Sequence, residues 1–292
     1  MIYTRLNGGL GNQLFQYAAG RALSIKHAVS LCIDAKHLER SNAEVTPRRP
    51  ELHNFKWAGR LASSTESRRL GLIRYVSPFT RLFHLTTPYV EKRPQFNVEF
   101  NRLGDDVYLI GYWQSFKYFT GIANLLFQDL KPASALSRRS ENIAQQIDAT
   151  LSVALHVRRG DYVSLRSASI FHGVLSGEYY MAAVASVNAS LALPNFFVFS
   201  DDLEWCRANL KLGDSAVFVD HNAGEDAWQD LILMGRCQHH IIANSSFSWW
   251  GAWLADQRWS GSNRLVIAPK QWFGSTPQQD LSDRFPAHWL SV

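Results

Sequence analysis

The stretch SVALHVRRGDYVS, residues 152–164, indicates the fold class because an apolar run of strand type ends there in charged side chains. His156, Arg158, Arg159 and Asp161 follow one another within six positions. Short apolar runs recur through the second half of the chain and alternate with helical patterns, which is typical of a parallel sheet covered on both faces. Ligands of such sheets bind outside the carboxyl ends of the strands, so we expect functional residues where these runs end.

The same alternation of strands and helices begins at the N-terminus and predicts an α/β protein. We expect strands at residues 2–6, 29–34, 107–113, 152–157, 195–200, 216–220, 239–244 and 264–269, and helices at 13–27, 116–127, 202–210 and 226–238. Residues 40–105 are rich in Arg and Pro and predict short helices and loops. A Pro followed by a polar helix in residues 129–149 favours a boundary there. We therefore expect two domains, 1–148 and 149–292.

Composition narrows the class of protein. Of the 292 residues 46% are hydrophobic, and no apolar run approaches the roughly 20 residues that a spanning helix needs. No signal peptide is evident at the N-terminus. The three cysteines are far apart and form no CxxC motif, which favours reduced thiols. These features predict a soluble cytoplasmic protein that is at most peripheral at the inner face of a membrane.

Charge is concentrated in one segment. Residues 36–93 hold twelve Lys or Arg and five Asp or Glu, a balance of +7, whereas the whole chain carries +5. Such a segment favours an anionic membrane surface or an anionic substrate, and an ordinary solvated face explains it equally well. We expect no nucleic-acid partner.

The paired arginines at the end of the run 152–157 have two interpretations. His156 and Arg158 project to the same side of a strand, whereas Arg159 and Asp161 belong to the following loop. In one interpretation Asp161 pairs with an arginine and pins the loop. In the other, the guanidinium groups form a fork of donors for a diphosphate, which we favour.

Two further strand ends carry polar clusters. Asp201 and Asp202 follow the run 195–200 and are expected to cap a helix, to accept hydrogen bonds from a guanine edge, or to hold a cation. No third carboxylate follows closely, which weakens the cation interpretation. In the stretch ANSSFSWWGAWLA, residues 243–255, a helix N-terminus offers donors to phosphate. Ser245, Ser246 and Phe247 would supply these donors.

The remaining features of these stretches concern packing and the first turn. Trp249, Trp250 and Trp253 recur at helical spacing, so we expect at least two of them in the core. At the N-terminus, NGGLGNQLFQ, residues 7–16, is not a full dinucleotide fingerprint. Its glycines allow a ligand to approach the backbone closely, and we expect Asn12 and Gln13 to offer amide donors at the rim.

Four of these stretches together resemble the bacterial α-1,2-fucosyltransferases, which are related to the animal blood-group H enzymes. The resemblance rests on GGLGNQLFQYAAGRAL at 8–23, HVRRGDYV at 156–163, VFSDD at 198–202 and ANSSFSWWGAWLA at 243–255. HGVLSGEYY at 172–180 and APKQWF at 268–273 are also similar. The order and spacing of these stretches fit across nearly the whole chain.

The resemblance implies a metal-independent glycosyltransferase of the GT-B type, with two Rossmann-like domains facing each other across a cleft. The C-terminal domain would hold GDP-fucose and the N-terminal domain would shape the acceptor site. Arg158, helped by Arg159, would bind the diphosphate. The other implied donor contacts are His156 and one of Asp201 and Asp202 near the nucleoside, Ser245 to Phe247 near the phosphates, and Gly11 and Asn12 near the diphosphate and the fucose.

The expected reaction is an inverting transfer of L-fucose from GDP-L-fucose to the 2-hydroxyl of a terminal β-galactoside. Asp161 is the first candidate for the general base, and His172 and Glu178 are alternatives for the base or for acceptor contacts. No divalent metal or other cofactor is expected. The acceptor would be a galactose-terminated oligosaccharide or a lipid-linked glycan. A transferase of another nucleotide sugar and a non-catalytic glycan-binding protein are the alternatives.

Overall fold

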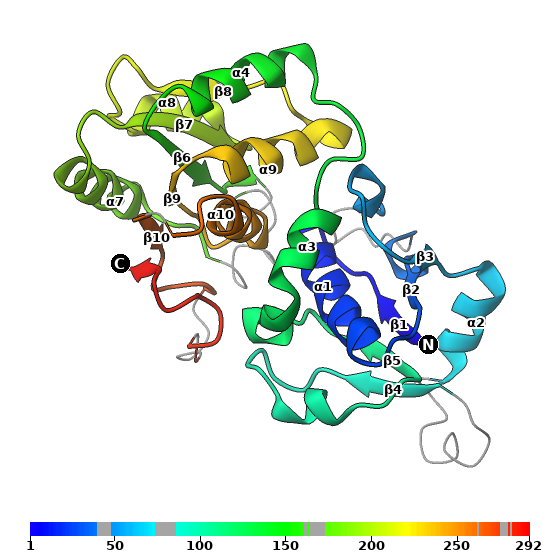
Figure 1. Cartoon of the computed structure of the whole chain (residues 1–292). Helices are drawn as coiled ribbons and strands as arrows, with labels where there is room; N and C mark the ends of the chain where they lie inside the picture. The colour runs from blue at the N-terminus through cyan, green and yellow to red at the C-terminus, as the bar shows by residue number, and fades with distance from the viewer. Residues whose placement is uncertain are drawn as a thin grey trace. The chain divides into compact units, whose positions relative to one another are not determined.

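The chain folds into two compact units of the α/β class (Figure 1). The computed structural model describes residues 1–39, 48–73, 86–160, 163, 173–261, 263–274, 280 and 282–292. The N-terminal unit comprises Met1–Ala133 and Asp280–Phe285, and the C-terminal unit comprises Ser134–Gln279 and Pro286–Val292. The C-terminal tail thus contributes a short segment to the N-terminal unit before it returns to the C-terminal one.

The division lies ahead of the polar helix α4 (Arg138–Asp148), whereas the sequence places the expected boundary after residue 148. The amide of Ser137 donates to Oε1 of Gln229 at 2.8 Å, which ties the start of α4 to helix α9 (Ala227–Arg236). The helix therefore packs with the C-terminal unit.

The N-terminal unit is built on a five-stranded parallel sheet in the order β3-β2-β1-β5-β4. The strands are β1 (Ile2–Arg5), β2 (Leu31–Asp34), β3 (Arg60–Leu61), β4 (Thr87–Val90) and β5 (Val107–Ile110). The strand order changes direction between β1 and β5. This change places the segments that follow these two strands side by side at the carboxyl edge of the sheet.

Helices cover both faces of this sheet. Thr4 of β1 faces α1 (Leu10–Lys26), where Gly20 allows the close approach. Tyr3 lies on the opposite face and packs with Leu70 of α2 (Ser64–Ile73). The remaining helical elements are η1 (Lys36–Glu39), η2 (Leu52–Asn54), η4 (Val98–Arg102), η5 (Phe116–Tyr118), η6 (Thr120–Ile122) and α3 (Ala123–Asp129).

The C-terminal unit has a six-stranded parallel sheet in the order β11-β10-β9-β6-β7-β8. Its strands are β6 (Ser152–Val157), β7 (Asn195–Ser200), β8 (Val217–Val219), β9 (His239–Ile241), β10 (Val266–Ala268) and β11 (Leu290–Ser291). Numbered within the unit, this order is the Rossmann order 3-2-1-4-5-6. The order reverses between β6 and β9, and ligands of this fold bind at that point.

The helices of the C-terminal unit bury large aromatic side chains against the sheet. Besides α4 and α9 they are α7 (Gly177–Ser190), α8 (Leu203–Asn209), the short η7 (Gly224–Asp226) and α10 (Ser246–Arg258). Trp249, Trp250 and Trp253 of α10 are all buried, which confirms that this aromatic run is core. Tyr180 of α7 and Phe197 of β7 are also fully enclosed.

The structure departs from the sequence expectations in several places. The region 40–105 holds two strands, β3 and β4, and the helix α2 in addition to short turns. The expected helix 116–127 is broken into η5, η6 and α3. Tyr118 and Phe119 explain the break, because both aromatic side chains turn into the core beside Trp113 and Phe15. The helix α7 and the short edge strand β11 were not expected from the sequence, and the expected strand 107–113 ends at Ile110.

The three cysteines are free and buried, in keeping with the reduced thiols expected from their spacing. Across the part of the chain that the structure describes, no helix combines the length and apolar character required to traverse a bilayer.

Candidate functional site

The carboxyl ends of β6 and β7 bring the two arginines and the two aspartates together. Nη1 of Arg158 lies 2.8 Å from Oδ2 of Asp201, and Nε of Arg159 lies 3.1 Å from Oδ2 of Asp202. The register explains the pairing, because Val157 of β6 is the partner of Ser200 in β7 and the chain leaves both strands at the same level. Two motifs that the sequence presents separately are therefore one cluster.

Arg159 and Asp202 also hold the start of α8 in place. The Arg159 guanidinium lies 4.2 Å from the centroid of the Trp205 ring, within the range of a cation–π contact. Asp202 is the N-cap of α8, and its Oδ1 accepts the amide of Trp205 at 3.1 Å. These contacts give Arg159 a structural role beside the donor-binding role expected from the sequence, and they confirm the capping interpretation of Asp202.

Asp201 is in contact with the whole turn that follows β6. Its Oδ1 accepts the backbone amide of Arg159 at 2.8 Å, while Oδ2 pairs with Arg158. A Cβ on Gly160 would lie 2.6 Å from that Oδ2, closer than real Cβ contacts come. A larger residue at position 160 would therefore displace the Asp201 carboxylate, which orients the Arg158 guanidinium while the Arg158 side chain stays 25% exposed.

His156 forms the buried base of this cluster. Its side chain is enclosed in the sheet, and burial lowers the pKa of the imidazole to about 4, helped by the positive charge of Arg158 and opposed by Asp201. The ring is therefore neutral at pH 7. It packs against Phe247 of α10, with ring centroids 5.9 Å apart. This contact joins the β6 end to the N-terminus of α10.

The turn between β9 and α10 combines capping with loop anchoring. Ser245 is the N-cap of α10 and its Oγ accepts the amide of Phe247 at 3.3 Å. Asn244 donates to the carbonyl oxygens of Gly173 and Trp272 at 3.2 and 3.3 Å. Ser246 is half-buried at the helix start. The turn thus fixes two further loops beside the point where the strand order reverses.

The first turn of the N-terminal unit is held by buried glutamines. Gln13 donates to the carbonyls of Gly8 and Arg49 at 3.1 and 2.8 Å and accepts the amide of Glu51 at 2.9 Å. Its side chain is fully buried. The expectation that Gln13 offers a donor at the rim is therefore wrong, because these three hydrogen bonds use its amide for structure. Gly8 has φ of 78°, a left-handed conformation that favours glycine.

Asn12 is half-buried, whereas Gly11 is enclosed within α1. Nε2 of Gln114 donates to Oδ1 of Asn12 at 2.6 Å, across the point where the strand order of the N-terminal sheet changes direction. Oε1 of Gln114 in turn accepts Nη1 of Arg284. In this relay Oδ1 of Asn12 accepts the hydrogen bond from Gln114, and the Nδ2 group of Asn12 is the part that can donate to a ligand.

Arg284 comes from the tail segment that joins the N-terminal unit. The segment is anchored by Asp283, whose carboxylate accepts the amide of Phe96 at 3.0 Å and pairs with Lys117. Burial lowers the pKa of the Arg284 guanidinium to about 10, and the charge of Glu91 opposes this shift. The Asn12–Gln114–Arg284 relay was missed by the sequence analysis, because nothing local to Arg284 indicates that the tail crosses to the other unit.

The loop after β5 contributes a strained residue beside this relay. Trp113 is buried and has φ of 56°, an uncommon conformation for a bulky side chain. The amides of Tyr112 and Trp113 donate to the Glu91 carboxylate at 2.6 and 3.0 Å. Burial raises the pKa of Glu91, and these hydrogen bonds together with Arg284 lower it. Strain of this kind is concentrated at functional sites.

The candidate bases are placed only in part. Asp161 and His172 lie outside the described residues. Glu178 lies in the first turn of α7, whose N-cap Ser176 accepts the amide of Tyr179. The neighbouring Gly177 approaches the Trp205 ring, since a Cβ there would lie 3.7 Å from it. Glu178 therefore belongs to the helix that starts beside α8. Among the residues with described positions, no group of three His, Cys, Asp or Glu side chains is arranged to hold a metal ion.

Several known proteins are similar to this chain in sequence. The model of the family described as Glycosyl transferase family 11 matches residues 86–292. An alpha-1,2-colitosyltransferase of Escherichia coli is 31% identical over 100% of this chain and 99% of its own length. The O-antigen biosynthesis glycosyltransferase WbnK of Escherichia coli is 30% identical over 96% of this chain and 98% of its own. Galactoside alpha-(1,2)-fucosyltransferase 1 of Saimiri sciureus is 27% identical over 58% of this chain and 49% of its own.

Solved structures share the fold at low sequence identity. POFUT1 in complex with GDP aligns with a TM-score of 0.50 at 15% identity over 91% of this chain and 97% of its own. The fucosyltransferase NodZ from Bradyrhizobium aligns with a TM-score of 0.50 at 14% identity over 86% of this chain and 90% of its own. The fold is therefore of the GT-B type, with one parallel sheet in each unit as expected.

Proposed function

The chain belongs to glycosyl transferase family 11, and on that premise we propose that it transfers L-fucose from GDP-L-fucose to the 2-hydroxyl of a terminal β-galactoside. The observation that carries the proposal is the oriented Arg158 at the point where the Rossmann order of the C-terminal sheet reverses. Relatives from bacteria and animals whose names specify α-1,2 transfer support the linkage.

The proposed transfer depends on stabilising the leaving group. As the glycosidic bond breaks, negative charge develops on the β-phosphate of GDP and the sugar becomes oxocarbenium-like. A guanidinium that is already aimed at this charge stabilises the transition state more than the ground state. Asp201 holds Arg158 in one orientation, so little reorganisation is needed at the moment of reaction. Charge stabilisation by these groups and by the α10 N-terminus is proposed to make a divalent metal unnecessary.

The acceptor hydroxyl then attacks the opposite face of the sugar. A single displacement inverts the β-linked donor into an α-linked product, without a carboxylate nucleophile. Asp161 is the first candidate for the base because it follows Gly160 directly in the chain, and His172 and Glu178 are the alternatives. Neutral His156 and the Asp201–Asp202 pair are proposed to lie at the nucleoside, and Ser245 to Phe247 at the phosphates.

In the N-terminal unit, Asn12 is proposed to approach the donor. The relay through Gln114 presents the amide group of Asn12 as a hydrogen-bond donor, which suits a sugar hydroxyl or a phosphate oxygen. Gly11 lies in the same turn of α1 and allows a close approach. The acceptor is proposed to be a galactose-terminated oligosaccharide or a lipid-linked glycan, taken up in the cytoplasm or at the inner face of a membrane.

One comparison supports colitose as an alternative donor sugar. The relative with 31% identity over the full chain is an alpha-1,2-colitosyltransferase, and colitose is fucose without its 3-hydroxyl. A site that hydrogen-bonds the 3-hydroxyl rejects a sugar that lacks it far more strongly than an apolar pocket rejects the extra hydroxyl. The choice between the two donors would then depend on whether this chain hydrogen-bonds the 3-hydroxyl.

The test is a donor panel scored by released GDP, with GDP-fucose and GDP-colitose offered alongside an array of galactosides. We expect kcat/KM to be higher with GDP-fucose, and linkage analysis of the product to show an α-1,2 bond. A higher kcat/KM with GDP-colitose would mean that colitose, not fucose, is the sugar transferred, and the proposed type of reaction would stand. Calorimetry with GDP alone separates both from a non-catalytic glycan-binding protein, which would bind sugar and not the nucleotide.

A further inference from the structure

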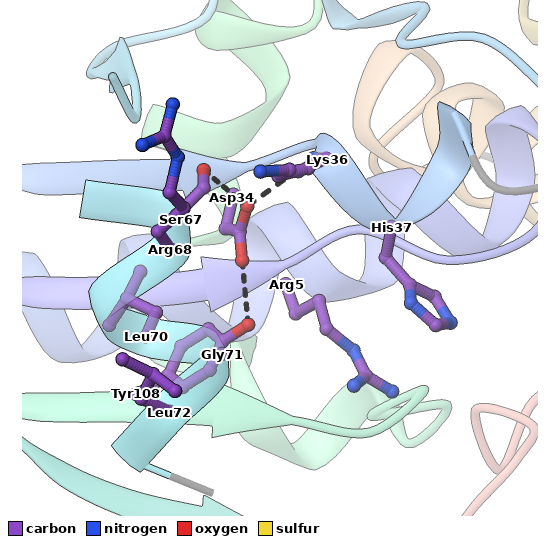
Figure 2. Close-up of a pocket in the computed structure, with 10 residues that line it drawn as sticks. All are labelled: Arg5, Asp34, Lys36, His37, Ser67, Arg68, Leu70, Gly71, Leu72 and Tyr108. Carbon is purple, nitrogen blue, oxygen red and sulfur yellow. Dashed lines mark hydrogen bonds between the residues drawn. The ribbon is translucent and has the colours of Figure 1, made fainter. Parts of the chain in front are cut away.

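A pocket of about 420 Å³ lies within the N-terminal unit (Figure 2). It is a half-open pocket bordered by α2, by η1 and by the carboxyl ends of β1 and β2, and we call it the α2 pocket. Its volume falls within the roughly 300–1,000 Å³ typical of sites for small ligands. All of its lining residues belong to one unit, so its shape does not depend on the position of the other unit.

The floor of the α2 pocket is a carboxylate whose hydrogen bonds are satisfied. Asp34 is buried and accepts Oγ of Ser67 at 2.8 Å, the hydroxyl of Tyr108 at 2.7 Å and the amide of Lys36 at 3.3 Å. Figure 2 shows these dashed contacts converging on Asp34. A carboxylate held by three donors is a structural element of the pocket wall, and its negative charge is spread over those donors.

Most of the charged residues in the lining are cationic. Arg5, Lys36 and Arg68 line the pocket together with His37, against the single carboxylate of Asp34. Arg5 is the residue paired with Asp34 in the β1–β2 register, yet its guanidinium extends away from that carboxylate in Figure 2. Within the described parts of the chain, none of these three cations forms an ion pair.

Among the described residues, the acidic residue of α2 next to the pocket is already paired elsewhere. Glu66 on α2 is engaged by Arg60, with Nη2 and Oε1 2.6 Å apart. Arg69, which follows Arg68 on the same helix, donates to the hydroxyl of Tyr3 at 3.2 Å on the sheet face. Successive residues of α2 thus differ: Arg69 is used in packing, whereas Arg68 lines the pocket. Two of the twelve basic residues of the segment 36–93, Lys36 and Arg68, therefore lie at this pocket.

We propose that the α2 pocket binds a phosphate or diphosphate ester carried by the acceptor glycan. Two arginines and a lysine line this half-open pocket, and their side chains can donate charge-assisted hydrogen bonds to the oxygens of such a group. Leu70 and the exposed Leu72 supply an apolar wall beside the cations, which suits the organic group esterified to the phosphate. The role as an acceptor site rests on the proposed function, whereas the binding of the anion does not.

The first test is calorimetry with inorganic pyrophosphate in the presence of saturating GDP, which occupies the expected donor site. Arg68→Gln is expected to weaken pyrophosphate binding about tenfold, and its matched control Arg69→Gln, one position along the same helix, less than twofold. Asp34→Asn removes the negative charge from the floor and is expected to strengthen binding several-fold, a gain that misfolding cannot produce. Equal affinities in the wild type, Arg68→Gln and Asp34→Asn would overturn the proposal.

The second test uses two acceptors that differ only in a diphosphate ester at the reducing end. Arg68→Gln is expected to raise KM about tenfold for the esterified acceptor and to leave kcat and the KM of the neutral acceptor unchanged. Equal KM changes for the two acceptors would overturn the acceptor role. If no donor is turned over but pyrophosphate binding still follows the charge changes, the proposed function fails and the anion site stands.

A third arm distinguishes an acceptor site from a membrane-binding surface. Vesicles of phosphatidylcholine with and without phosphatidylglycerol are sedimented with the wild type and with Arg68→Gln. We expect the variant to bind both vesicle types as the wild type does. Loss of vesicle binding without loss of pyrophosphate affinity would mean that the cations face a lipid surface, and the proposal would be abandoned.

Discussion

Asp201 lies 2.8 Å from the guanidinium of Arg158 and accepts the amide of Arg159 through its other carboxylate oxygen. One carboxylate from the end of β7 thus shapes the turn after β6 and orients its first arginine. A pair of this kind in a partly exposed site contributes modestly to stability. Its larger consequence is geometric, because it determines where the positive charge of Arg158 is directed.

Replacing Arg158 with Ala should reduce kcat by about two to three orders of magnitude, the usual cost of removing one donor to a developing negative charge. The matched control is Arg139→Ala, which removes an arginine from an exposed ion pair with Asp220 in the same unit. Steady-state rates and circular dichroism would be measured for both. Near-normal turnover in Arg158→Ala would exclude the central role proposed for this residue.

Gly160→Ala should lower activity by displacing Asp201, because the added Cβ would lie 2.6 Å from its Oδ2. We expect kcat to fall at least tenfold while the melting temperature changes by only a few degrees. Gly121→Ala is the control, since a Cβ at that position meets nothing within 4 Å. If both variants retain full activity, the position of Asp201 does not matter for turnover.

Gln114→Glu tests the relay to Asn12. The new carboxylate would keep the contact with Arg284 and so preserve the fold, but it would face the oxygen of Asn12 and favour a flip of that amide. KM for the donor should rise about tenfold without loss of stability. A double-mutant cycle supplies the control: in an Asn12→Ala background the same change should have little further effect. Additive effects would show that Gln114 acts independently of Asn12.

The stability of the C-terminal unit should fall in acid because of His156. The pKa of His156 is about 4 in the folded protein, against 6.5 as its ordinary value. Between these values the unfolded chain binds a proton that the folded protein does not, so the free energy of unfolding decreases as the pH falls. At pH 5 the loss due to this residue is about 2 kcal/mol.

His156→Phe removes this titration and should give a shallower pH dependence than the wild type. Urea midpoints measured between pH 7.5 and 4.5 would reveal the difference in slope. The other buried histidines with lowered pKa values, His239 and His240, contribute equally to both proteins and cancel in the comparison. Parallel curves for the two proteins would contradict a buried neutral His156.

Removal of divalent metal should leave the rate unchanged. Asp201 and Asp202 are both engaged by arginines, which weakens them as ligands of a cation. Initial rates after dialysis against EDTA would be compared with rates in added magnesium or manganese. A rate that falls with EDTA and returns with metal would reinstate the cation interpretation of the two aspartates.

The short apolar runs predicted most of the strands, and their ends predicted the polar clusters. Ser152–Val157 and Asn195–Ser200 form strands where the sequence places them, because a buried parallel strand needs only a local run of apolar residues. The shortest strands depend instead on their neighbours in the folded sheet. The strands β3 and β11 have two residues each and exist because a neighbouring strand offers hydrogen bonds.

The same distinction applies to the candidate site. Arg158, Asp201 and Asn12 were identified from stretches of the chain in which glycine or charge follows an apolar run. Only the folded structure shows three further contacts. Asp201 pairs with Arg158, the Gln13 amide is hydrogen-bonded inside the first turn, and Arg284 of the tail contacts Gln114. Parallel sheets bring together strand ends from distant parts of the chain, and no local pattern records which ends become neighbours.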